Sequence, residues 1–397
     1  MSEVLVIGGG AAGLAASIAA ARAGKKVTLL EASGKTGAKI LASGGGKCNY
    51  TNLSVCPGSY YDENKGFIEP LLDIFGAYDA IDFFESIGVY PSIKNGFVYP
   101  RSEEAATVLS ALLRECEKLK VSIHTNAAVT HIERFKSGFK VFCEDYSYEA
   151  DKVILAAGSP AGATGALCAY DIAKSFGHSI NELSAALTGV LFSDILCSAA
   201  GIRTRAKASI LTNDEILCES EGEIQLTSYG ASGVPVMNIS RFLGSVKEQY
   251  LVIDFIPETD EEEFDAALLS GTPLTAFFPK KLAALFDIML MERHPKHYIV
   301  KLDGKRSFES AQVTRGGIPI CEIDPLTFES KLAKGLFIAG EMLDVDGKCG
   351  GYNLHFAWAS GFLAGCAAAG AEYKRTFTDA DIERWKALDT GSRRSFI

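Results

Sequence analysis

The sequence predicts an α/β fold built around a doubly wound parallel sheet, and three observations lead to that prediction. The chain opens with a short, β-rich apolar run that passes directly into a glycine-rich turn and an alanine-rich helix, residues 3–24. A second strand-like run, residues 25–31, ends on an acidic residue, and a third apolar run, residues 336–339, follows near the C-terminus. Strand, tight turn, helix and strand in this order form a βαβ unit, because parallel strands need a crossover connection.

Length, composition and charge narrow the class of protein. The 397 residues, 48% of them hydrophobic, are enough for two or three packed units. The 39 basic and 49 acidic residues give a net charge of −10, which favours a small-molecule substrate and disfavours nucleic acid or an anionic membrane as partner. The start lacks a basic signal segment and no apolar run reaches about 18 residues, so we expect a cytoplasmic protein without stable membrane association. The oligomeric state is left open.

The first turn carries a dinucleotide-binding fingerprint. Gly8, Gly10 and Gly13 form G-x-G-x-x-G, and Glu31 follows the last glycine by 18 residues. The glycines allow a tight turn, close approach to a pyrophosphate and close helix packing, while the helix N-terminus favours negative charge. A glutamate at this place accepts from the hydroxyls of an unphosphorylated ribose. The residues expected to hold the nucleotide are Gly8, Gly10, Ala11, Ala12, Gly13, Glu31 and Ala32.

The fingerprint alone does not separate FAD from NAD, and two later segments bear on that choice. Residues 126–158 read as short alternating strands that close on VILAAG, a meander familiar from FAD-binding Rossmann domains. The strand 336–339 brings the next residues to its carboxyl end, where such sheets bind ligands. We therefore expect further cofactor contacts from Val129, Ala157, Gly158, Gly340 and Glu341.

The middle of the chain reads as an insertion. Strand-like stretches with polar turns run from about 185 to 253, whereas residues 259–292 show helix-like apolar spacing behind an acidic start. A barrel interrupted by a helical lid accounts for this pattern. The predicted boundaries are 1–183 and 323–397 for the nucleotide-binding domain, 184–256 and 298–322 for a β-barrel substrate domain, and 257–297 for a small helical domain.

Five motifs, in order along the chain, resemble those of the BaiN-like flavoproteins, also called aminoacetone oxidase-like. They are IGGGAAGLAA, GAKILASGGGKCNYTN, LTSYGASGVP, TRGGIP and GLFIAGEMLDVDGKCGGYNLHFAWASG. The resemblance implies noncovalent FAD in a discontinuous, glutathione reductase-like Rossmann domain that carries an inserted β-barrel and a small helical domain. It also implies one of two activities: NAD(P)H-linked reduction of conjugated 3-oxo bile acid intermediates, or oxidation of aminoacetone.

The second glycine cluster, in ILASGGGKCNYTN, is interpreted as the other half of the same cofactor site. No clear strand and helix flank it, so it fails the test for a second nucleotide domain. Its glycines would let the backbone pass along FAD, with a lysine and a serine near phosphate or ribityl oxygens and an asparagine near the isoalloxazine ring. These residues are Lys39, Ser43, Gly44, Gly45, Gly46 and Asn49.

The start of the last long helix and three other positions are candidates for flavin chemistry. Backbone N–H groups there would stabilise negative charge near the flavin N1, and the residues are Gly351, Tyr352, Asn353 and Leu354. For proton transfer we consider Tyr352, Tyr229 and His355, each of which can equally be a packed, hydrogen-bonded side chain. Arg315 either anchors an anionic group or forms a surface ion pair.

Metal and cysteine chemistry are not expected. His294 and His297 in RHPKH are separated by a proline, and no acidic or thiol partner follows at ligand spacing. The ten cysteines contain no CxxC pair, so we expect reduced packing residues; Cys48 and Cys349 are the two in flavin-binding stretches.

Three functions remain open at this point. The first is an ene-reductase in which NAD(P)H, a transient donor because only one full fingerprint is present, reduces FAD and hydride passes from N5 to an enone. The second is a flavin amine oxidase that acts on a small aminoketone and releases peroxide. The third is a flavoprotein that works on transfer RNA, which the net charge of −10 disfavours.

Overall fold

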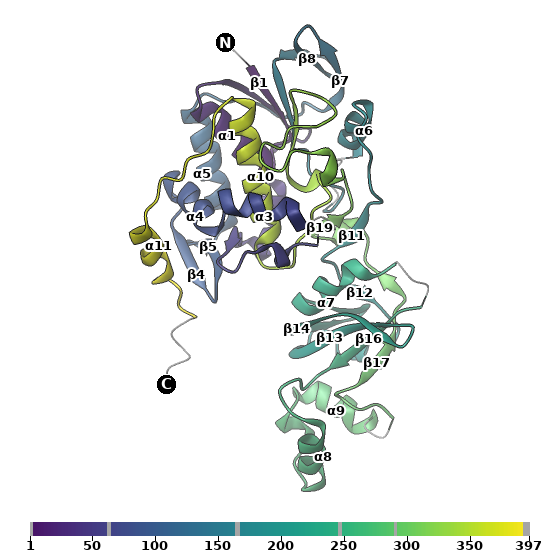
Figure 1. Ribbon diagram of the computed structural model, residues 1–397. Coiled ribbons are helices and arrows are strands. Elements are labelled where there is room, and N and C mark those ends of the chain that lie inside the picture. Colours follow the sequence, from purple (N-terminus) through teal and green to yellow (C-terminus); the bar gives the residue numbers. More distant parts are fainter. Residues whose placement is uncertain (1–2, 62–64, 163–166, 245–247, 290–291, 392–397) are drawn as a thin grey trace. The chain divides into compact units, whose positions relative to one another are not determined.

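The computed structural model describes residues 3–61, 65–162, 167–244, 248–289 and 292–391, and Figure 1 shows its elements. The chain divides into two compact units. The first contains residues 1–160, 164–183 and 315–397, and the second contains residues 161–163 and 184–314. The second unit is therefore an insertion in the first.

A five-stranded parallel sheet forms the centre of the first unit. Its order is β20 (Leu336–Ile338), β10 (Lys152–Leu155), β1 (Glu3–Ile7), β2 (Lys26–Leu30) and β6 (Ser122–His124). Its pairings are all parallel. The predicted parallel α/β sheet is therefore confirmed, including the return of the chain to β20. Strands β20, β10, β1 and β2 are apolar and mostly buried, as expected for a sheet covered on both faces, whereas the edge strand β6 is largely exposed.

Helices α1 (Ala11–Arg22) and α10 (Tyr352–Ala368) lie side by side (Figure 1) and approach closely. A Cβ atom on Gly361 would lie 2.2 Å from the carbonyl oxygen of Ala12, and one on Gly365 would lie 2.3 Å from that of Ala16. Small residues therefore allow the two backbones to touch. This contact joins segments about 340 residues apart and fixes the N-termini of both helices in one unit.

The other elements of the first unit surround this centre. The helices are α2 (Ala38–Ala42), α3 (Lys65–Ile74), α4 (Ala77–Ser86), α5 (Ala105–Lys118), α6 (Leu167–Ser175) and α11 (Asp379–Lys386). The predicted meander is present as β7 (Val129–Phe135), β8 (Gly138–Cys143) and β9 (Ser147–Ala150). A second small sheet contains β3 (Thr51–Asn52), β5 (Phe97–Pro100) and β4 (Pro91–Lys94).

The second unit is built on a seven-stranded antiparallel sheet. Its order is β17 (Tyr298–Lys301), β16 (Tyr250–Asp254), β13 (Arg203–Thr212), β14 (Glu215–Thr227), β15 (Gly230–Gly233), β12 (Val190–Leu191) and β18 (Gly304–Lys305). A two-residue turn with positive φ at both positions joins the two long strands β13 and β14, which suits the twist of a hairpin. The two end strands β17 and β18 follow one another in the chain. Closure into a barrel stays a prediction.

Three further helices and one short pair of strands lie outside these sheets. Helix α7 (Val234–Ile239) packs on β14, and α8 (Glu261–Leu269) and α9 (Lys280–Met289) follow β16. Strand β11 (Ser184–Ala186) pairs with β19 (Val313–Arg315). In the part of the chain that the structure describes, no helix has both the length and the apolar content needed to cross a bilayer.

Candidate cofactor and active site

The glycines of the first turn serve two different purposes. A Cβ on Gly13 would lie 1.8 Å from the carbonyl oxygen of Gly8, and a Cβ on Gly8 would lie 2.3 Å from that of Ala156, so packing excludes side chains at both positions. A Cβ on Gly10 would meet no atom within 4 Å. No side chain caps α1, which leaves its first N–H groups for another acceptor. Gly10 therefore keeps open the space in front of a helix N-terminus.

Glu31 lies at the end of β2 with its carboxylate turned to this loop. One oxygen accepts the N–H of Gly9 at 2.7 Å, and the other accepts the N–H and the hydroxyl of Ser33 at 2.8 and 2.7 Å. The structure thus brings Glu31 to the first glycine turn. A carboxylate has about four acceptor sites. Three are used here, so Glu31 can still accept a hydrogen bond from a ribose hydroxyl.

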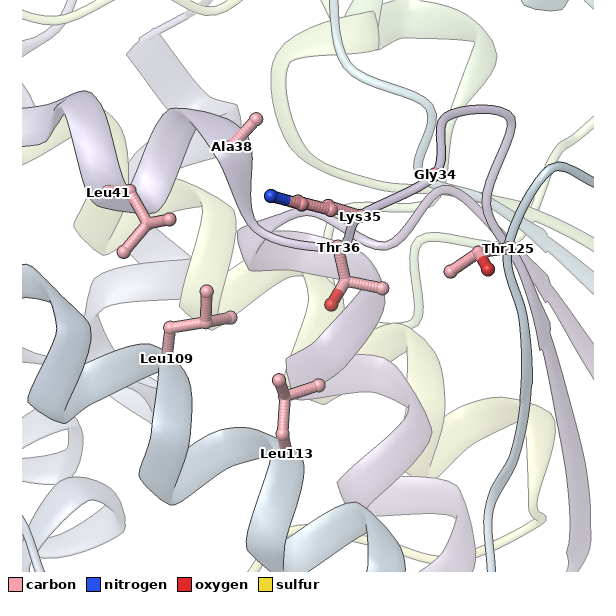
Figure 2. Close-up of a pocket in the computed structure, with 8 residues that line it drawn as sticks. All are labelled: Gly34, Lys35, Thr36, Ala38, Leu41, Leu109, Leu113 and Thr125. Carbon is pink, nitrogen blue, oxygen red and sulfur yellow. The ribbon is translucent and has the colours of Figure 1, made fainter.

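A cavity of about 390 Å³ is lined in part by residues that follow Glu31 in the chain (Figure 2). The side chains of Leu41, Leu109 and Leu113 form its apolar side. Its lining is completed by Gly34, Lys35, Thr36, Ala38 and Thr125. Sequence reasoning missed this cavity. Residues 34–36 lie three to five positions after Glu31, close enough for the motif to point to them, but the leucines of α5 lie too far along the chain for any spacing rule to select them.

Three polar side chains meet at the carboxyl ends of β10 and β20. Lys39 Nζ lies 2.7 Å from one oxygen of Glu341, and Ser159 Oγ donates to the other at 2.7 Å. Lys39 also reaches Ser159 Oγ at 3.3 Å. Two of these residues were predicted from the sequence, whereas Ser159, directly after the predicted Gly158, was missed. The lysine comes from α2, which the second strand and its loop bring to the same sheet edge.

The second glycine cluster is a left-handed turn directly after α2. Gly44, Gly45 and Gly46 have φ values of 56°, 64° and 86°, a region that L side chains rarely adopt. Asn49 follows, and its Oδ1 is buried without a partner among the described residues. A Cβ on Gly351 would lie 2.9 Å from that Oδ1. Asn49, just after the turn, and the start of α10 are therefore close together, and a cofactor site shared by the two stays a prediction.

The N-terminus of α10 also lacks a side-chain cap among the described residues, although Thr51 and Asn49 lie close to Gly351. Gly351 precedes the helix with φ of 94°, and no side chain caps it. The side chain of Asn353 accepts from the N–H of Gly347 at 2.7 Å and donates to its carbonyl oxygen at 2.9 Å, so it closes the preceding loop. Any ligand contact at Asn353 is thus left to its backbone. Tyr352 is half-buried, and burial raises its pKa.

His355 is placed as a packed core residue. It is fully buried, its Nδ1 lies 2.9 Å from Thr51 Oγ1, and its Nε2 lies 3.1 Å from the carbonyl oxygen of Phe75. A carbonyl only accepts, so Nε2 carries the proton and Nδ1 accepts from the threonine. Burial lowers the pKa of His355 to about 4. Of the two interpretations considered, the geometry favours the hydrogen-bonded core histidine over a proton donor.

Three further residues of the quoted motifs lie at different places in the fold. Lys47, directly after the second glycine cluster, points to the surface, where it forms an ion pair of 2.9 Å with Glu103. Cys48 is buried, and burial raises its pKa to about 11, which disfavours a reactive thiolate. Tyr229 lies in the second unit with the Arg306 guanidinium 4.9 Å from its ring centroid.

The structure gives the position and burial of three further candidates. Arg315 ends β19 and is partly exposed, and Val129 opens β7 and is buried. Ala32, after Glu31, is exposed. Their predicted roles stay predictions.

A family model described as the HI0933-like protein Rossmann domain matches residues 2–367. The chain belongs to this family. The resemblance to BaiN-like flavoproteins is thereby confirmed. Among HI0933-like relatives, the 3-dehydro-bile acid delta(4,6)-reductase of Clostridium scindens is 37% identical over 408 residues, which cover 93% of this chain and 99% of the relative. The ribosomal RNA dihydrouridine synthase of Escherichia coli is 29% identical over 385 residues, which cover 90% and 96%.

One solved structure has a similar fold over nearly the whole chain. The 3-ketosteroid delta1-dehydrogenase from Sterolibacterium denitrificans, solved with 1,4-androstadiene-3,17-dione, has a TM-score of 0.51 and 12% identity, with 94% of this chain and all of that chain covered. At this identity the likeness concerns the fold alone.

Proposed function

We propose that the chain is an FAD-dependent oxidoreductase that reduces a carbon–carbon double bond conjugated to a carbonyl group. The observation that carries the cofactor part of the proposal is Asn49 Oδ1, which is buried without a partner among the described residues and lies beside the start of α10. A buried polar group without a partner is costly, so it implies a ligand that supplies one. The flavin ring offers both donors and acceptors along one edge.

The residues present fit a dinucleotide along the whole site. The open space at Gly10 and the uncapped α1 suit a pyrophosphate, since helix N-termini favour anions. Glu31 suits the ribose, and the leucine-lined cavity beside it suits a flat aromatic base. Lys39 places a positive charge at the carboxyl ends of β10 and β20, where Glu341 and Ser159 hold it. Bound FAD would supply hydride from its N5.

The chain's own part in the reaction is to bind, orient and handle a proton. The first N–H groups of α10 would stabilise negative charge on a group in front of them. Tyr352, the first residue of that helix, is protonated at neutral pH because a phenol has a pKa of about 10, and burial raises the pKa of this one further. It is therefore proposed as the donor that protonates the α-carbon of the substrate.

The proposed substrate class is based on the names of two relatives. The Clostridium scindens relative is named as a bile acid delta(4,6)-reductase, which supports a 3-oxo compound with a conjugated double bond as the first candidate. The Escherichia coli relative is named as a ribosomal RNA dihydrouridine synthase, which supports uridine in RNA as the second. The double bond of uracil is also conjugated to a carbonyl, so both candidates need the same chemistry. The predicted absence of a nucleic-acid partner is thus left to experiment.

Anaerobic stopped-flow absorbance separates these functions. The flavin is first reduced with NADH or NADPH and then mixed with a 4-ene or 4,6-diene 3-oxo bile acid, with ribosomal RNA, or with air. We expect rapid reoxidation by the enone. Reoxidation by RNA alone would establish the second candidate, whereas no reoxidation by any enone or RNA would overturn the proposal. Peroxide released with aminoacetone in air would instead establish an amine oxidase.

Tyr352→Phe is expected to slow reoxidation by the enone by on the order of 100-fold, because general acids contribute about 10²–10⁴-fold. Reduction of the flavin by NAD(P)H should not change, since that step needs no proton from the protein. Both half-reactions are measured in the same stopped-flow assay, with Tyr229→Phe as the comparison. Unchanged reoxidation in Tyr352→Phe would rule out this residue as the donor.

A further inference from the structure

The helical segment of the second unit holds a cluster of side chains that the proposed flavin chemistry does not use. Glu261 and Asp265 lie four residues apart on α8, so they share one face of that helix. The chain after α9 brings two histidines to this face. His297 Nε2 lies 2.9 Å from Glu261 Oε2, and His294 Nε2 lies 3.2 Å from Asp265 Oδ1. Ligand atoms of Glu261, Asp265 and His294 all lie within 4.8 Å of one another.

We propose that these four side chains bind one Zn²⁺ ion. Two imidazole nitrogens with two carboxylate oxygens form a donor set for a borderline transition metal, whereas Mg²⁺ and Ca²⁺ prefer oxygen ligands alone. Ligand atoms about 2.0–2.2 Å from a tetrahedral zinc ion lie about 3.3 Å from one another. The two nitrogen–oxygen pairs here are at 2.9 and 3.2 Å, and three of the four ligands already lie within 4.8 Å of one another, so the exposed His297 is the ligand that has to move closer.

The histidine turn is held rigidly against the start of α8. Lys296, between the two histidines, is largely buried and donates from Nζ to Asp254 Oδ2 at 3.1 Å and to the carbonyl oxygens of Ile256 and Thr259 at 3.1 and 2.6 Å. The N–H of Phe255 donates to the carbonyl oxygen of Pro295 at 3.0 Å. Because the segment 254–259 leads directly into α8, these bonds fix the distance between histidines and carboxylates.

Two further contacts orient the first histidine. The ring of His294 meets the buried ring of Phe264, on α8, edge to face at 5.4 Å. Its Nδ1 accepts the N–H of Lys296 at 3.2 Å, so the neutral ring carries its proton on Nε2. Zinc coordination through Nε2 moves this proton to Nδ1 and opens the contact with Lys296. The side chains of the other three ligands are 48–61% exposed, which leaves them free to close around the ion.

A bound ion would link α8 to the turn at residues 294–297, because it would be coordinated by side chains from both. Without an ion the same groups form two separate histidine–carboxylate contacts, one at each end of the cluster. A shared ion joins all four and couples its binding energy to folding of the helical segment. Chelation is then expected to loosen this segment without touching the first unit's flavin site.

Zinc binding to the full-length, untagged, FAD-loaded protein tests the proposal. Calorimetric titration with ZnCl2 at pH 7.5, with metal analysis after dialysis, is expected to give one ion per chain. His294→Gln and Asp265→Asn should each weaken binding by on the order of 100-fold, since even outer partners of metal ligands contribute about 10–100-fold. The matched control is Glu262→Gln, which removes the same charge from a neighbouring position of α8 and should bind as the wild type does.

Thermal unfolding provides the second readout. Zn²⁺ should raise the Tm of the wild type and of the control, and EDTA should reverse the rise. If His294→Gln lowers the Tm in metal-free buffer, its weaker zinc binding could reflect misfolding. The test then rests on Asp265→Asn, because the side chain of Asp265 is exposed. No saturable zinc binding by the wild type, or equal binding by the Asp265→Asn variant, would overturn the proposal and leave two ion pairs. The zinc measurements are independent of the flavin assays, because the flavin assays monitor the first unit and the zinc ligands lie in the second.

Discussion

Gly10→Val is expected to abolish flavin binding while leaving the fold intact. A Cβ at this position meets no protein atom within 4 Å, and the backbone there has φ of −85° and ψ of −165°, which a valine adopts without strain. The new side chain would instead fill the space in front of α1, where we place the pyrophosphate. Losing two charged hydrogen bonds of about 1.5–3 kcal/mol each corresponds to a loss of affinity of about 100-fold or more.

Titration of FAD into the apoprotein, followed by flavin fluorescence, measures this effect. The matched control is Gly66→Val in α3, where a Cβ also meets no atom within 4 Å and no cofactor contact is expected. Gly13→Val provides the contrast, because a Cβ there lies 1.8 Å from the carbonyl oxygen of Gly8 and the variant should fail to fold. Wild-type FAD affinity in a folded Gly10→Val protein would contradict the placement of the pyrophosphate.

The first unit is expected to lose about 3 kcal/mol of stability between pH 7 and pH 4 through His355 alone. Burial lowers the pKa of this histidine from 6.5 to about 4, and one pKa unit corresponds to about 1.4 kcal/mol. The unfolded chain therefore binds a proton at a higher pH than the folded chain does. The contribution is fully present above pH 6.5 and is lost as the pH falls toward 4.

His355→Gln should remove this pH dependence, because a glutamine amide stays neutral and offers both a donor for Phe75 and an acceptor for Thr51. Urea unfolding at several pH values, followed by tryptophan fluorescence, measures the slope. Both tryptophans, Trp358 and Trp385, are buried in the first unit, so the signal reports that unit. The exposed His131→Gln variant is the control and should keep the wild-type slope. An equal slope in His355→Gln would show that other groups cause the loss.

The sequence predicted the elements that depend on local pattern. β1, α1, β2 and the meander of β7, β8 and β9 lie where period, glycine and apolar runs placed them, because each is specified by neighbouring residues. The fingerprint also selected the glycines at which we place the nucleotide. It did not separate their roles, since Gly10 and Gly13 look alike until the atoms around each are known.

The tertiary structure decided which distant groups meet. Ser159 joins Lys39 and Glu341 because the ends of two strands and a helix converge at one sheet edge. The ring of His355 contacts Thr51 Oγ1 and the carbonyl oxygen of Phe75, neither of which is near it in sequence, and these contacts favour a packed core histidine.

The same holds for the proposed zinc site. RHPKH offers no acidic partner at ligand spacing, yet α8 supplies two carboxylates from about 30 residues upstream. Spacing along a chain determines only what one helix or strand can present on a face. Whether such faces meet depends on packing between elements far apart in sequence, and that packing is established only when the chain has folded.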